Sequence, residues 1–362
     1  MDNYVVLRQM AEAIYGQVLL CRDDTTAELV AVKKISMSRA ATRQSETHLL
    51  HENAIQELEM NHRVQAAGGH GYICRLRDDF YFQDGDDTML AMVFDYCPRG
   101  ELLHALSLAK RFDQHAALEY VAQIAQAIDF LHMHEIAHRD ISLENVLLTD
   151  GHCIQLCDFG LACHATQCTN ETVGKLLYMA PEVLAGQTYI PKQADMWSLG
   201  VALFTMVVGH YPFHEASMYD AFYSIHARLG LAALLRKHNV AWISPDMQEL
   251  LGHLLDVDPL NRYTIRHMLA HALVRPCFGQ NVEGSLSTVS LENEAAGKEC
   301  PEQNVPEAPS PPRPVAAAAP IMTIRSPQVV QGQAPLPPRP KTSIRTYLKQ
   351  KLSHFRIPWT KS

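Results

Sequence analysis

The chain has 362 residues, of which 47% are hydrophobic and 19% charged, so it is an ordinary globular protein long enough for two structural units. Its net charge of -8 argues against a nucleic-acid-binding protein, because such proteins need a basic surface. The start, MDNYVVLRQM, lacks the pattern of a secretory signal, no apolar run is long enough to cross a membrane, and nine scattered cysteines favour free thiols, so we expect a cytoplasmic location.

Residues 4–97 are rich in predicted strands. YVVLRQM, GQVLLCR, ELVAVKKI and TMLAMVFDY are runs of apolar and β-branched residues separated by polar turns. Between them, ENAIQELEMNHRV carries apolar residues at helical spacing. We therefore expect a small β-rich unit with one main helix.

Residues 98–275 have a helical pattern instead. HAALEYVAQIAQAIDFLHMH and DMWSLGVALFTMVVG both have long apolar faces. A short apolar-rich segment, CIQLC, is predicted to be a strand. The second unit should therefore be larger and mainly helical.

The composition changes after residue 275. Residues 276–340 are rich in Pro and Ala, contain PPRP twice, and are predicted to be disordered and partly polyproline II. The PPRP copies favour an SH3-type partner, with a plain linker as the alternative.

Residues 341–362 contain six Lys or Arg and no Asp or Glu, among apolar residues at near-helical spacing. This basic amphipathic segment suits an anionic membrane surface, which would make the protein peripherally attached, or a calmodulin-like partner; the alternative is an unbound end.

Several motifs supply the groups that phosphoryl transfer requires. HRDISLEN contains Asp140 and, five residues later, Asn145; DFG contributes Asp158; and VAVK ends in Lys33 on a predicted strand. Such a reaction needs a base near the accepting hydroxyl, oxygen ligands for Mg2+ and cations on the nucleotide phosphates. The order and spacing of these motifs point to that chemistry jointly, whereas any one of them alone would be weak evidence.

With these motifs, the chain resembles eukaryotic protein kinases over about residues 4–275. The resemblance implies an α+β, bilobal fold and the use of ATP and Mg2+. It also implies that Lys33 holds the α- and β-phosphates and pairs with Glu57, that Asp140 accepts the proton of the substrate hydroxyl, and that Asn145 and Asp158 bind the metal.

The resemblance extends to the adenosine site and to structural motifs. It places the gatekeeper at Phe94, the adenine-binding hinge at Asp95 to Cys97, a ribose contact at Glu101, and walls around the base at Val18, Ala31 and Leu147. It also implies a structural ion pair between Glu182 and Arg262, and a carboxylate at Asp195 that holds the catalytic-loop backbone.

Two departures from the family pattern weaken the expected site. The loop that covers the phosphates reads AEAIYGQV, with Ala11 and Ala13 at two glycine positions and only Gly16 and Val18 retained. Alanine disfavours positive φ, so a stiffer loop, further from the phosphates, is expected. Asn61 stands one helical turn after Glu57, where a large apolar residue is usual, and a buried amide there needs partners.

A third departure concerns charge. Ser142 occupies the position two residues after the catalytic aspartate, where a lysine usually contacts the transferred phosphate, while Lys175 replaces the usual threonine before YMAPE. The hydroxyl and the ammonium are thus exchanged between two positions that normally touch. We predict that Lys175 supplies the missing charge, because its effect depends on where the ammonium lies; the alternative is a Lys175 that points to solvent.

These features favour an active Ser/Thr kinase of protein substrates. The alternative is a pseudokinase that binds nucleotide or acts as a scaffold; a small-molecule kinase fits poorly with the complete segment from DFG to MAPE.

Glu144 and Glu101 favour a mild preference for arginine upstream of the phosphorylated residue of the substrate. Glu171 stands where relatives carry an activating phosphothreonine, which predicts partial constitutive activity through Arg139.

Overall fold

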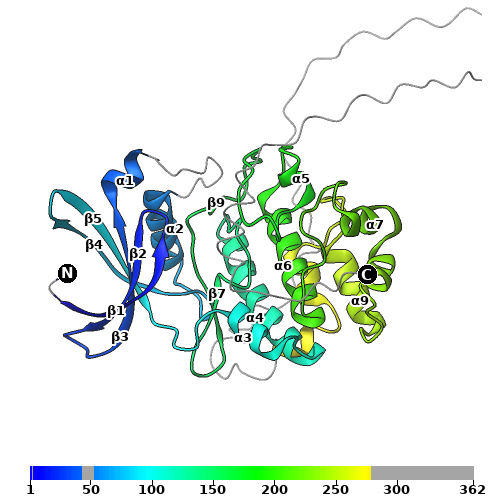
Figure 1. Ribbon diagram of the computed structural model, residues 1–362, viewed down its shortest axis with the longest axis horizontal. Helices are drawn as coiled ribbons and strands as arrows, with labels where there is room; N and C mark the ends of the chain where they lie inside the picture. The colour runs from blue at the N-terminus through cyan, green and yellow to red at the C-terminus, as the bar shows by residue number, and fades with distance from the viewer. Residues whose placement is uncertain (2, 43–52, 279–362) are drawn as a thin grey trace, which may run out of the picture. The chain divides into compact units, whose positions relative to one another are not determined.

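The computed structural model describes residues 1, 3–42 and 53–278. The basic segment at 341–362 and nearly all of the proline-rich segment lie outside these residues, and so do the predictions made for them. Figure 1 shows the strands β1 to β5 gathered at one end of the described chain and helices filling the other. The bilobal α+β fold expected from the sequence is therefore confirmed.

The N-terminal lobe is built on one antiparallel sheet of five strands in the order β1-β2-β3-β5-β4. Its strands are β1 (Tyr4–Ala13), β2 (Gly16–Asp23), β3 (Leu29–Ser36), β4 (Leu76–Asp84) and β5 (Asp87–Asp95). Four of them coincide with predicted strands, but β4 was missed. Only Leu76 of that strand is fully buried, so LRDDFYFQD carries no regular apolar alternation that could have signalled it.

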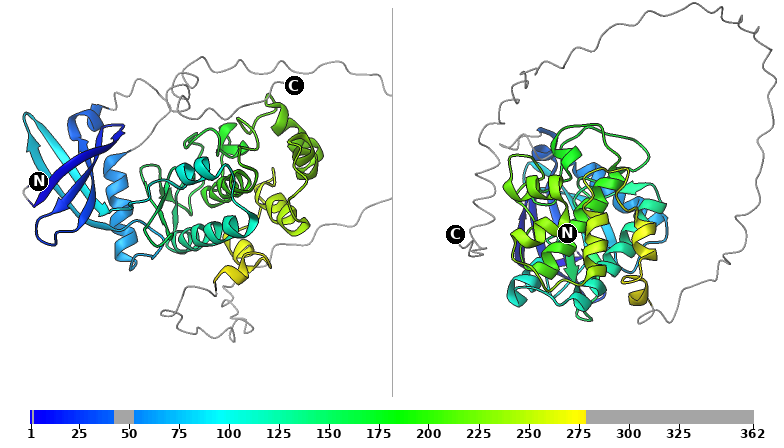
Figure 2. Two further views of the ribbon diagram at one scale, coloured as in Figure 1. Left: turned by 60° about the horizontal axis from the view of Figure 1, so that its bottom comes forward. Right: turned by 90° about the vertical axis from the view of Figure 1, so that its right-hand side faces the viewer.

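The main helix, α2 (Ala54–Ala66), covers one face of the sheet, as the two views of Figure 2 show. The side chain of Asn53 caps α2 by accepting hydrogen bonds from two backbone N–H groups of the first turn. The core between α2 and the sheet comprises Tyr15, Ile35, Ala54, Leu58, Leu76, Leu90 and Met92. This packing fixes the side of α2 that carries Glu57 against the sheet.

The turn between β1 and β2 is fastened to its neighbours. The Ser36 N–H donates to the Tyr15 carbonyl at 2.9 Å, and Arg39 donates to the Ile14 carbonyl at 3.3 Å. A Cβ on Gly16 would lie 1.8 Å from the Lys34 carbonyl oxygen, so only glycine allows this close approach. The tip of the hairpin is therefore held in place even though two of the usual glycines are missing.

The C-terminal lobe packs helices around one large core that includes Trp197, Phe204 and Phe213. Four short strands form two small sheets beside α4, and they end at the loops that carry the site. The helices are α3 (Leu102–Ala109), α4 (Gln114–Met133), α5 (Pro181–Leu184), α6 (Pro191–Val208), α7 (Ala221–Leu229), α8 (Leu231–Lys237), α9 (Pro245–Leu254) and α10 (Ile265–Ala270); α1 (Met37–Thr42) belongs to the other lobe. The short strands are β6 (Ile136–Ala137), β7 (Val146–Leu148), β8 (Ile154–Leu156) and β9 (Cys163–His164). No helix of the described residues has both the length and the apolar content to cross a bilayer.

Candidate active site

An ion pair joins the sheet of the N-terminal lobe to α2. The Lys33 ammonium on β3 donates to both carboxylate oxygens of Glu57, at 2.6 and 2.7 Å. It also lies 3.4 Å from Oδ1 of Asp158, which belongs to the other lobe. Three residues far apart in the sequence thus meet at the place that the motifs predicted.

Asn61 finds a partner without leaving its helix. Its side chain is buried and donates to the Glu57 carbonyl one turn earlier, at 2.9 Å. The buried donor is therefore satisfied. The rings of His138 and Phe159 pack on each other with centroids 5.2 Å apart, so this contact forms without an apolar residue at position 61.

The catalytic loop lies between β6 and β7 and is held from behind by Asp195 of α6. The Asp195 carboxylate accepts hydrogen bonds from the backbone N–H groups of His138, at 2.9 Å, and Arg139, at 2.7 Å. Arg139 has a φ of +63°, a left-handed conformation that is strained for a non-glycine residue. Asp195 is 1% exposed, so these are buried bonds to a charged group, and they stabilise that strained backbone.

Asp140 and Asn145 face each other across this loop. The Asn145 amide nitrogen donates to the Asp140 carbonyl oxygen at 2.9 Å and to its carboxylate Oδ2 at 2.7 Å. Asn145 is 7% exposed, and these contacts fix the orientation of its amide. Its remaining polar atom, Oδ1, is thereby turned toward the centre of the site.

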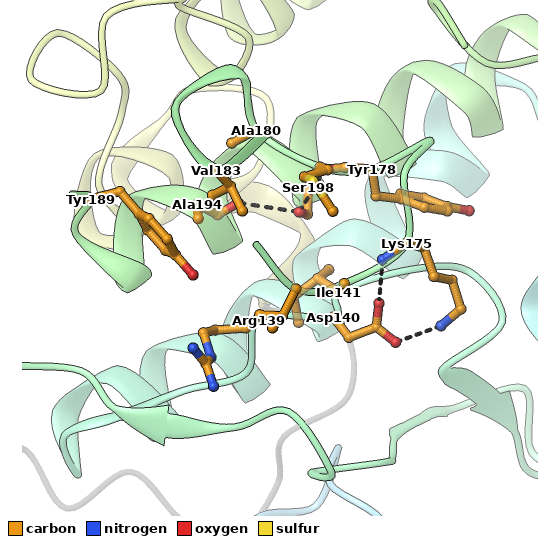
Figure 3. Close-up of a pocket in the computed structure, with 13 residues that line it drawn as sticks. Arg139, Asp140, Ile141, Lys175, Tyr178, Ala180, Val183, Tyr189, Ala194 and Ser198 are labelled. Carbon is orange, nitrogen blue, oxygen red and sulfur yellow. Dashed lines mark hydrogen bonds and ion pairs between the residues drawn. The ribbon is translucent and has the colours of Figure 1, made fainter. Parts of the chain in front are cut away.

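Lys175 reaches that centre from the activation segment (Figure 3). Its ammonium donates to Asp140 Oδ2 at 2.6 Å, to Ser142 Oγ at 2.9 Å and to Asn145 Oδ1 at 3.1 Å. Its backbone N–H donates to Asp140 Oδ1 at 3.0 Å. Lys175 does not point to solvent, and the exchanged hydroxyl and ammonium of positions 142 and 175 do touch.

The glycine before Lys175 makes this approach of the backbone feasible. Gly174 has a φ of +97°, and a Cβ at that position would lie 2.6 Å from the Arg139 carbonyl oxygen. A side chain there would therefore force the activation segment away from the catalytic loop. Gly174 allows the activation segment to approach the catalytic loop, and the hydrogen bond from the Lys175 N–H to Asp140 fixes the two segments relative to each other.

Electrostatics keep the site charged. Burial alone would raise the pKa of Asp158, but the Lys33 and Lys175 ammonium groups and the Gly160 N–H outweigh it and lower the pKa to about 2. Burial would likewise lower the pKa of Lys175, yet Asp140 and Glu144 raise it above its ordinary value. Burial raises the pKa of Glu57, and Lys33 opposes that effect.

The donor set at this site suits magnesium. The Asp158 carboxylate and the Asn145 amide oxygen are hard oxygen ligands of the kind that Mg2+ prefers. The thiol of Cys157 next to them donates to the Asn145 carbonyl at 3.3 Å, and burial raises the pKa of Cys157, so it stays a neutral thiol rather than a thiolate ligand. Within the described residues, no group of three or more His, Cys, Asp or Glu side chains is arranged for another metal.

The residues expected around a nucleotide lie on the strands and hinge that surround Lys33. Val18 pairs with Ala11 on one side and with Lys33 on the other, and Ala31 pairs with Phe94. Ala13 pairs with Gly16 at the end of the hairpin, Glu101 forms a bridge with Leu147, and Asp95 ends β5 just before Cys97. Ala11 and Ala13 are simply part of the extended strand β1, so this loop continues the sheet.

The activation segment is tied to the catalytic loop by a second charge pair. The Arg139 guanidinium donates to Glu171 Oε2 at 2.6 Å and to the Leu161 carbonyl at 2.6 Å. The Tyr189 hydroxyl donates to the Glu171 carbonyl at 3.0 Å. The backbones of Thr169 and Tyr189 form an isolated antiparallel β-bridge. Glu171 therefore lies on the arginine expected to bind an activating phosphate.

A small cavity opens beside Asp140, under the segment that leads to α5. The Tyr178 hydroxyl at one side donates to Glu144 at 3.0 Å and lies 3.3 Å from the Tyr211 hydroxyl. The cavity is lined by Arg139, Asp140, Ile141, Val173, Gly174, Lys175, Tyr178, Met179, Ala180, Val183, Tyr189, Ala194 and Ser198. Further out, Glu182 and Arg262 form a buried two-bonded ion pair at 2.7 and 3.0 Å that holds this segment.

Two tyrosines of the site were missed by sequence reasoning. Tyr15, in the β1–β2 turn, is 7% exposed and lines a small pocket together with Lys33 and Glu57. Tyr211 contacts the Tyr178–Glu144 pair. No sequence signal distinguished Tyr15 from an exposed turn residue. Tyr211 follows α6 closely in the sequence, and only the folded structure shows that it lies next to Tyr178.

Comparisons with known proteins agree with this geometry. Residues 4–274 match the family described as the protein kinase domain. The chain is 32% identical to an Aurora kinase of Schizosaccharomyces pombe, over 73% of this chain and 69% of that protein. It is also 32% identical to serine/threonine-protein kinase SRK2J of Arabidopsis thaliana, over 75% of this chain and 76% of that protein, and to serine/threonine-protein kinase SAPK3 of Oryza sativa, over 75% and 77%. With matches of this extent and a site in which Lys33, Glu57, Asp140, Asn145 and Asp158 converge, the chain belongs to the protein kinase family, on its serine/threonine side.

Proposed function

We propose that the chain transfers the γ-phosphate of ATP to serine and threonine hydroxyls of protein substrates, with Mg2+ as the metal. The observation that carries this proposal is one charged site between the two lobes, in which Lys33 contacts Asp158 and Lys175 contacts Asp140 and interacts electrostatically with Asp158. Lys33, Asp140 and Asp158 retain the residue type that the reaction requires.

Each residue would have a defined role. Lys33, oriented by Glu57, would hold the α- and β-phosphates, and Asp140 would orient the substrate hydroxyl and accept its proton. Asn145 and Asp158 would hold Mg2+, which neutralises phosphate charge when bound. Val18, Ala31, Leu147, Phe94 and the hinge from Asp95 to Cys97 would enclose adenine, with Glu101 at the ribose.

Lys175 would supply the positive charge that Ser142 lacks. Its ammonium lies 2.6 Å from the carboxylate that would receive the proton and 2.9 Å from Ser142 Oγ. A preorganised cation at this position stabilises negative charge that develops during transfer, regardless of which segment carries it.

The runner-up is a pseudokinase, favoured by Ala11 and Ala13 at two of the usual glycine positions of the β1–β2 hairpin. The two functions are separated by measuring transfer of radiolabelled phosphate from ATP with Mg2+ to a general protein substrate, for the native chain and for Asp158→Ala. Incorporation that depends on Asp158 supports the kinase, whereas equal incorporation by both proteins would leave only the binding function.

A mild preference for arginine upstream of the target residue is a further part of the proposal. Glu144 is half-buried and accepts a hydrogen bond from Tyr178, which lines the cavity, so one acidic group lies close to that cavity. Glu101 is the second carboxylate of this kind, but a further one that strongly basophilic kinases use is replaced by Thr205, which is 2% exposed and bonded to the Val201 carbonyl. A peptide array would test the preference; selection of proline or acidic residues would refute it.

The segments outside the described residues give separate proposals from their sequence alone. PSPPRP and PLPPRP suit an SH3-type groove. Residues 341–362, with six cations, suit an anionic membrane surface or a calmodulin-like partner of an otherwise cytoplasmic protein. Co-sedimentation with anionic liposomes, with and without residues 341–362, tests the membrane proposal, which fails if both proteins sediment equally.

A further inference from the structure

Two contacts, at residues 171 and 175, hold the activation segment to the catalytic loop. Glu171 accepts a hydrogen bond from the Arg139 guanidinium at 2.6 Å. Lys175 donates to Asp140 from its backbone N–H at 3.0 Å and from its ammonium at 2.6 Å, as Figure 3 shows. Arg139 and Asp140 are neighbours in the sequence, so the two contacts close a small ring of the chain. A change at one contact therefore bears on the other.

The three residues between these contacts are themselves held in place. The Thr172 hydroxyl donates to the Val183 carbonyl at 3.1 Å, and Val173 is 3% exposed. Gly174 lies so close to the catalytic loop that a Cβ there would be 2.6 Å from the Arg139 carbonyl oxygen. A stretch this short and this constrained transmits the position of Glu171 to Lys175 instead of absorbing a change in it.

The exchange of serine and lysine makes this coupling matter for the reaction. An ammonium at position 142 would belong to the catalytic loop, whose backbone Asp195 holds through two hydrogen bonds. In this chain position 142 is a buried serine, and the ammonium is carried by the activation segment. The position of the charge on Lys175 therefore depends on how that segment is held.

We propose that Glu171 is a positioning residue for Lys175: its pair with Arg139 holds the activation segment so that the Lys175 ammonium stays in contact with Asp140. The inference deepens the proposed function and rests on it, because it assumes that this ammonium serves phosphoryl transfer. It differs from simple neutralisation of Arg139, which would act on the catalytic loop alone and would need no lysine at position 175.

The reactivity of the Lys175 amine tests the contact without any need for activity. Acetic anhydride acylates an amine that is uncharged and accessible. Burial would lower the pKa of Lys175, but Asp140 and Glu144 outweigh it and raise that pKa, so the amine stays protonated. Its bonds to Ser142 and Asn145, at 2.9 and 3.1 Å, also cover it. Acylation in the native, full-length chain should therefore be slow.

In full-length Glu171→Ala, mass spectrometry should find Lys175 acylated about fivefold faster than in the native chain, because the ammonium leaves its acceptors more often. Lys192 is the internal reference: its side chain is 31% exposed and 3.5 Å from Glu135, and it should react at the same rate in both proteins. Glu249→Ala, at an exposed position on α9, is the matched control and should leave both rates unchanged.

A double-mutant cycle gives the second measurement. Lys175→Met keeps the length of the side chain and removes its charge. Glu171→Ala should lower kcat about fivefold in the native chain, but by less than about twofold beside Lys175→Met, because the group that Glu171 positions is then gone. Neutralisation of Arg139 alone predicts the same loss in both backgrounds.

Equal acylation of Lys175 in the native chain and in Glu171→Ala would overturn the inference. An unchanged kcat in Glu171→Ala, or a fivefold loss that persists beside Lys175→Met, would overturn it too. Glu171 is 51% exposed, so its replacement leaves the core intact. A native chain that transfers no phosphate would overturn the proposed function, whereas the acylation rates would still decide whether Glu171 positions Lys175.

Discussion

The Arg139 guanidinium lies 2.6 Å from the Glu171 carboxylate, and this pair connects the catalytic loop to the activation segment in the unphosphorylated chain. The Arg139 side chain is 6% exposed, whereas that of Glu171 is 51% exposed. A half-exposed carboxylate carries one negative charge, compared with nearly two on a phosphate, so it neutralises the arginine only in part. The arrangement is permanent because it needs no modification.

From this pair we expect the chain to be active without phosphorylation. Glu171→Ala should lower the kcat of phosphatase-treated protein by about fivefold, which corresponds to about 1 kcal/mol for a partly exposed ion pair. Glu249→Ala, at an exposed position on α9, should have no effect. Native protein that is inactive until Thr169 or Thr172 is phosphorylated would contradict this expectation.

Removing the ammonium of Lys175 should slow the chemical step. Lys175→Ala is expected to lower kcat by ten- to a thousand-fold, a loss of about 1.4–4 kcal/mol for one charged contact. The combined change Ser142→Lys with Lys175→Thr should recover more activity than the single changes predict additively, because the two positions touch. Steady-state rates of the native chain, Lys175→Ala, the two single changes and the combined change provide the measurement. An unchanged kcat in Lys175→Ala would show that Lys175 does not replace the usual lysine, and that the charge missing at Ser142 is simply lost.

Tyr15 should act as a brace between the hairpin and α2. Its side chain is 7% exposed and packs in the core with Ile35, Ala54 and Leu58, next to the Lys33–Glu57 pair. Tyr15→Ala should cost about 3 kcal/mol of unfolding free energy and raise the KM for ATP several-fold, because α2 loses its contact with the hairpin. Tyr15→Phe should restore both properties.

Tyr81 on β4 is a matched control for that experiment, since 52% of it is exposed. Tyr81→Ala should change neither the unfolding free energy nor the KM for ATP by more than a small amount. The brace is refuted if Tyr15→Ala binds ATP as well as Tyr81→Ala does.

Stability should fall in mild acid because of His238. Its ring stacks on Phe222, and Nε2 is bonded to the Pro212 carbonyl oxygen at 2.8 Å. The pKa of His238 is lowered from 6.5 to about 4, chiefly by burial; the Pro212 bond and Asp220 oppose this effect, while nearby His210 and Lys237 add to it. Between these two values the unfolded chain binds more protons than the folded one, so stability is complete above pH 6.5 and declines as the pH falls toward 4.

The expected loss between pH 7 and pH 5 is on the order of 1 kcal/mol, because the pH falls only part of the way to the folded-state pKa and the partial exposure of the ring reduces the effect further. Denaturant unfolding of the native chain at pH 7 and at pH 5 measures it. His238→Phe should show a smaller difference between the two pH values than the native chain, while His253→Phe, at a more exposed site, should keep the native difference. Equal pH dependence in His238→Phe would assign the effect to other groups.

The sequence predicted those parts of the site whose residues are constrained by short chain segments. Asp140 and Asn145 lie five residues apart on one loop, and Lys33 lies on a strand with clear apolar alternation, so their chemistry could be inferred from motifs. The contact between Lys175 and Ser142 could be predicted as well, but only because the family resemblance places those positions together. The third bond of Lys175, to Asn145, depends on the orientation of an amide and could not be read from the sequence.

Other features depend on packing that leaves no local signal. β4 has one buried residue, and its other positions are exposed or half-buried in no regular alternation, so its pattern resembles that of a loop. Tyr15 occupies a turn, where a tyrosine can face solvent or core, and only the space left between Ile35 and α2 decides. The sequence indicated that a buried Asn61 would need a hydrogen-bond partner. That the acceptor is the Glu57 carbonyl of the same helix depends on the side-chain rotamer, which the sequence does not give.

The contact between Lys175 and Ser142 also constrains how this enzyme could have evolved. Starting from the common arrangement, a lysine gained first at position 175 would place two ammonium groups in one small volume, and a lysine lost first at position 142 would leave none. Either intermediate is a poorer catalyst, so the two substitutions are favourable only together. Descendants of this chain should therefore inherit the pair as a unit, and a homologue with serine at the first position and threonine at the second should transfer phosphate about ten- to a thousand-fold more slowly.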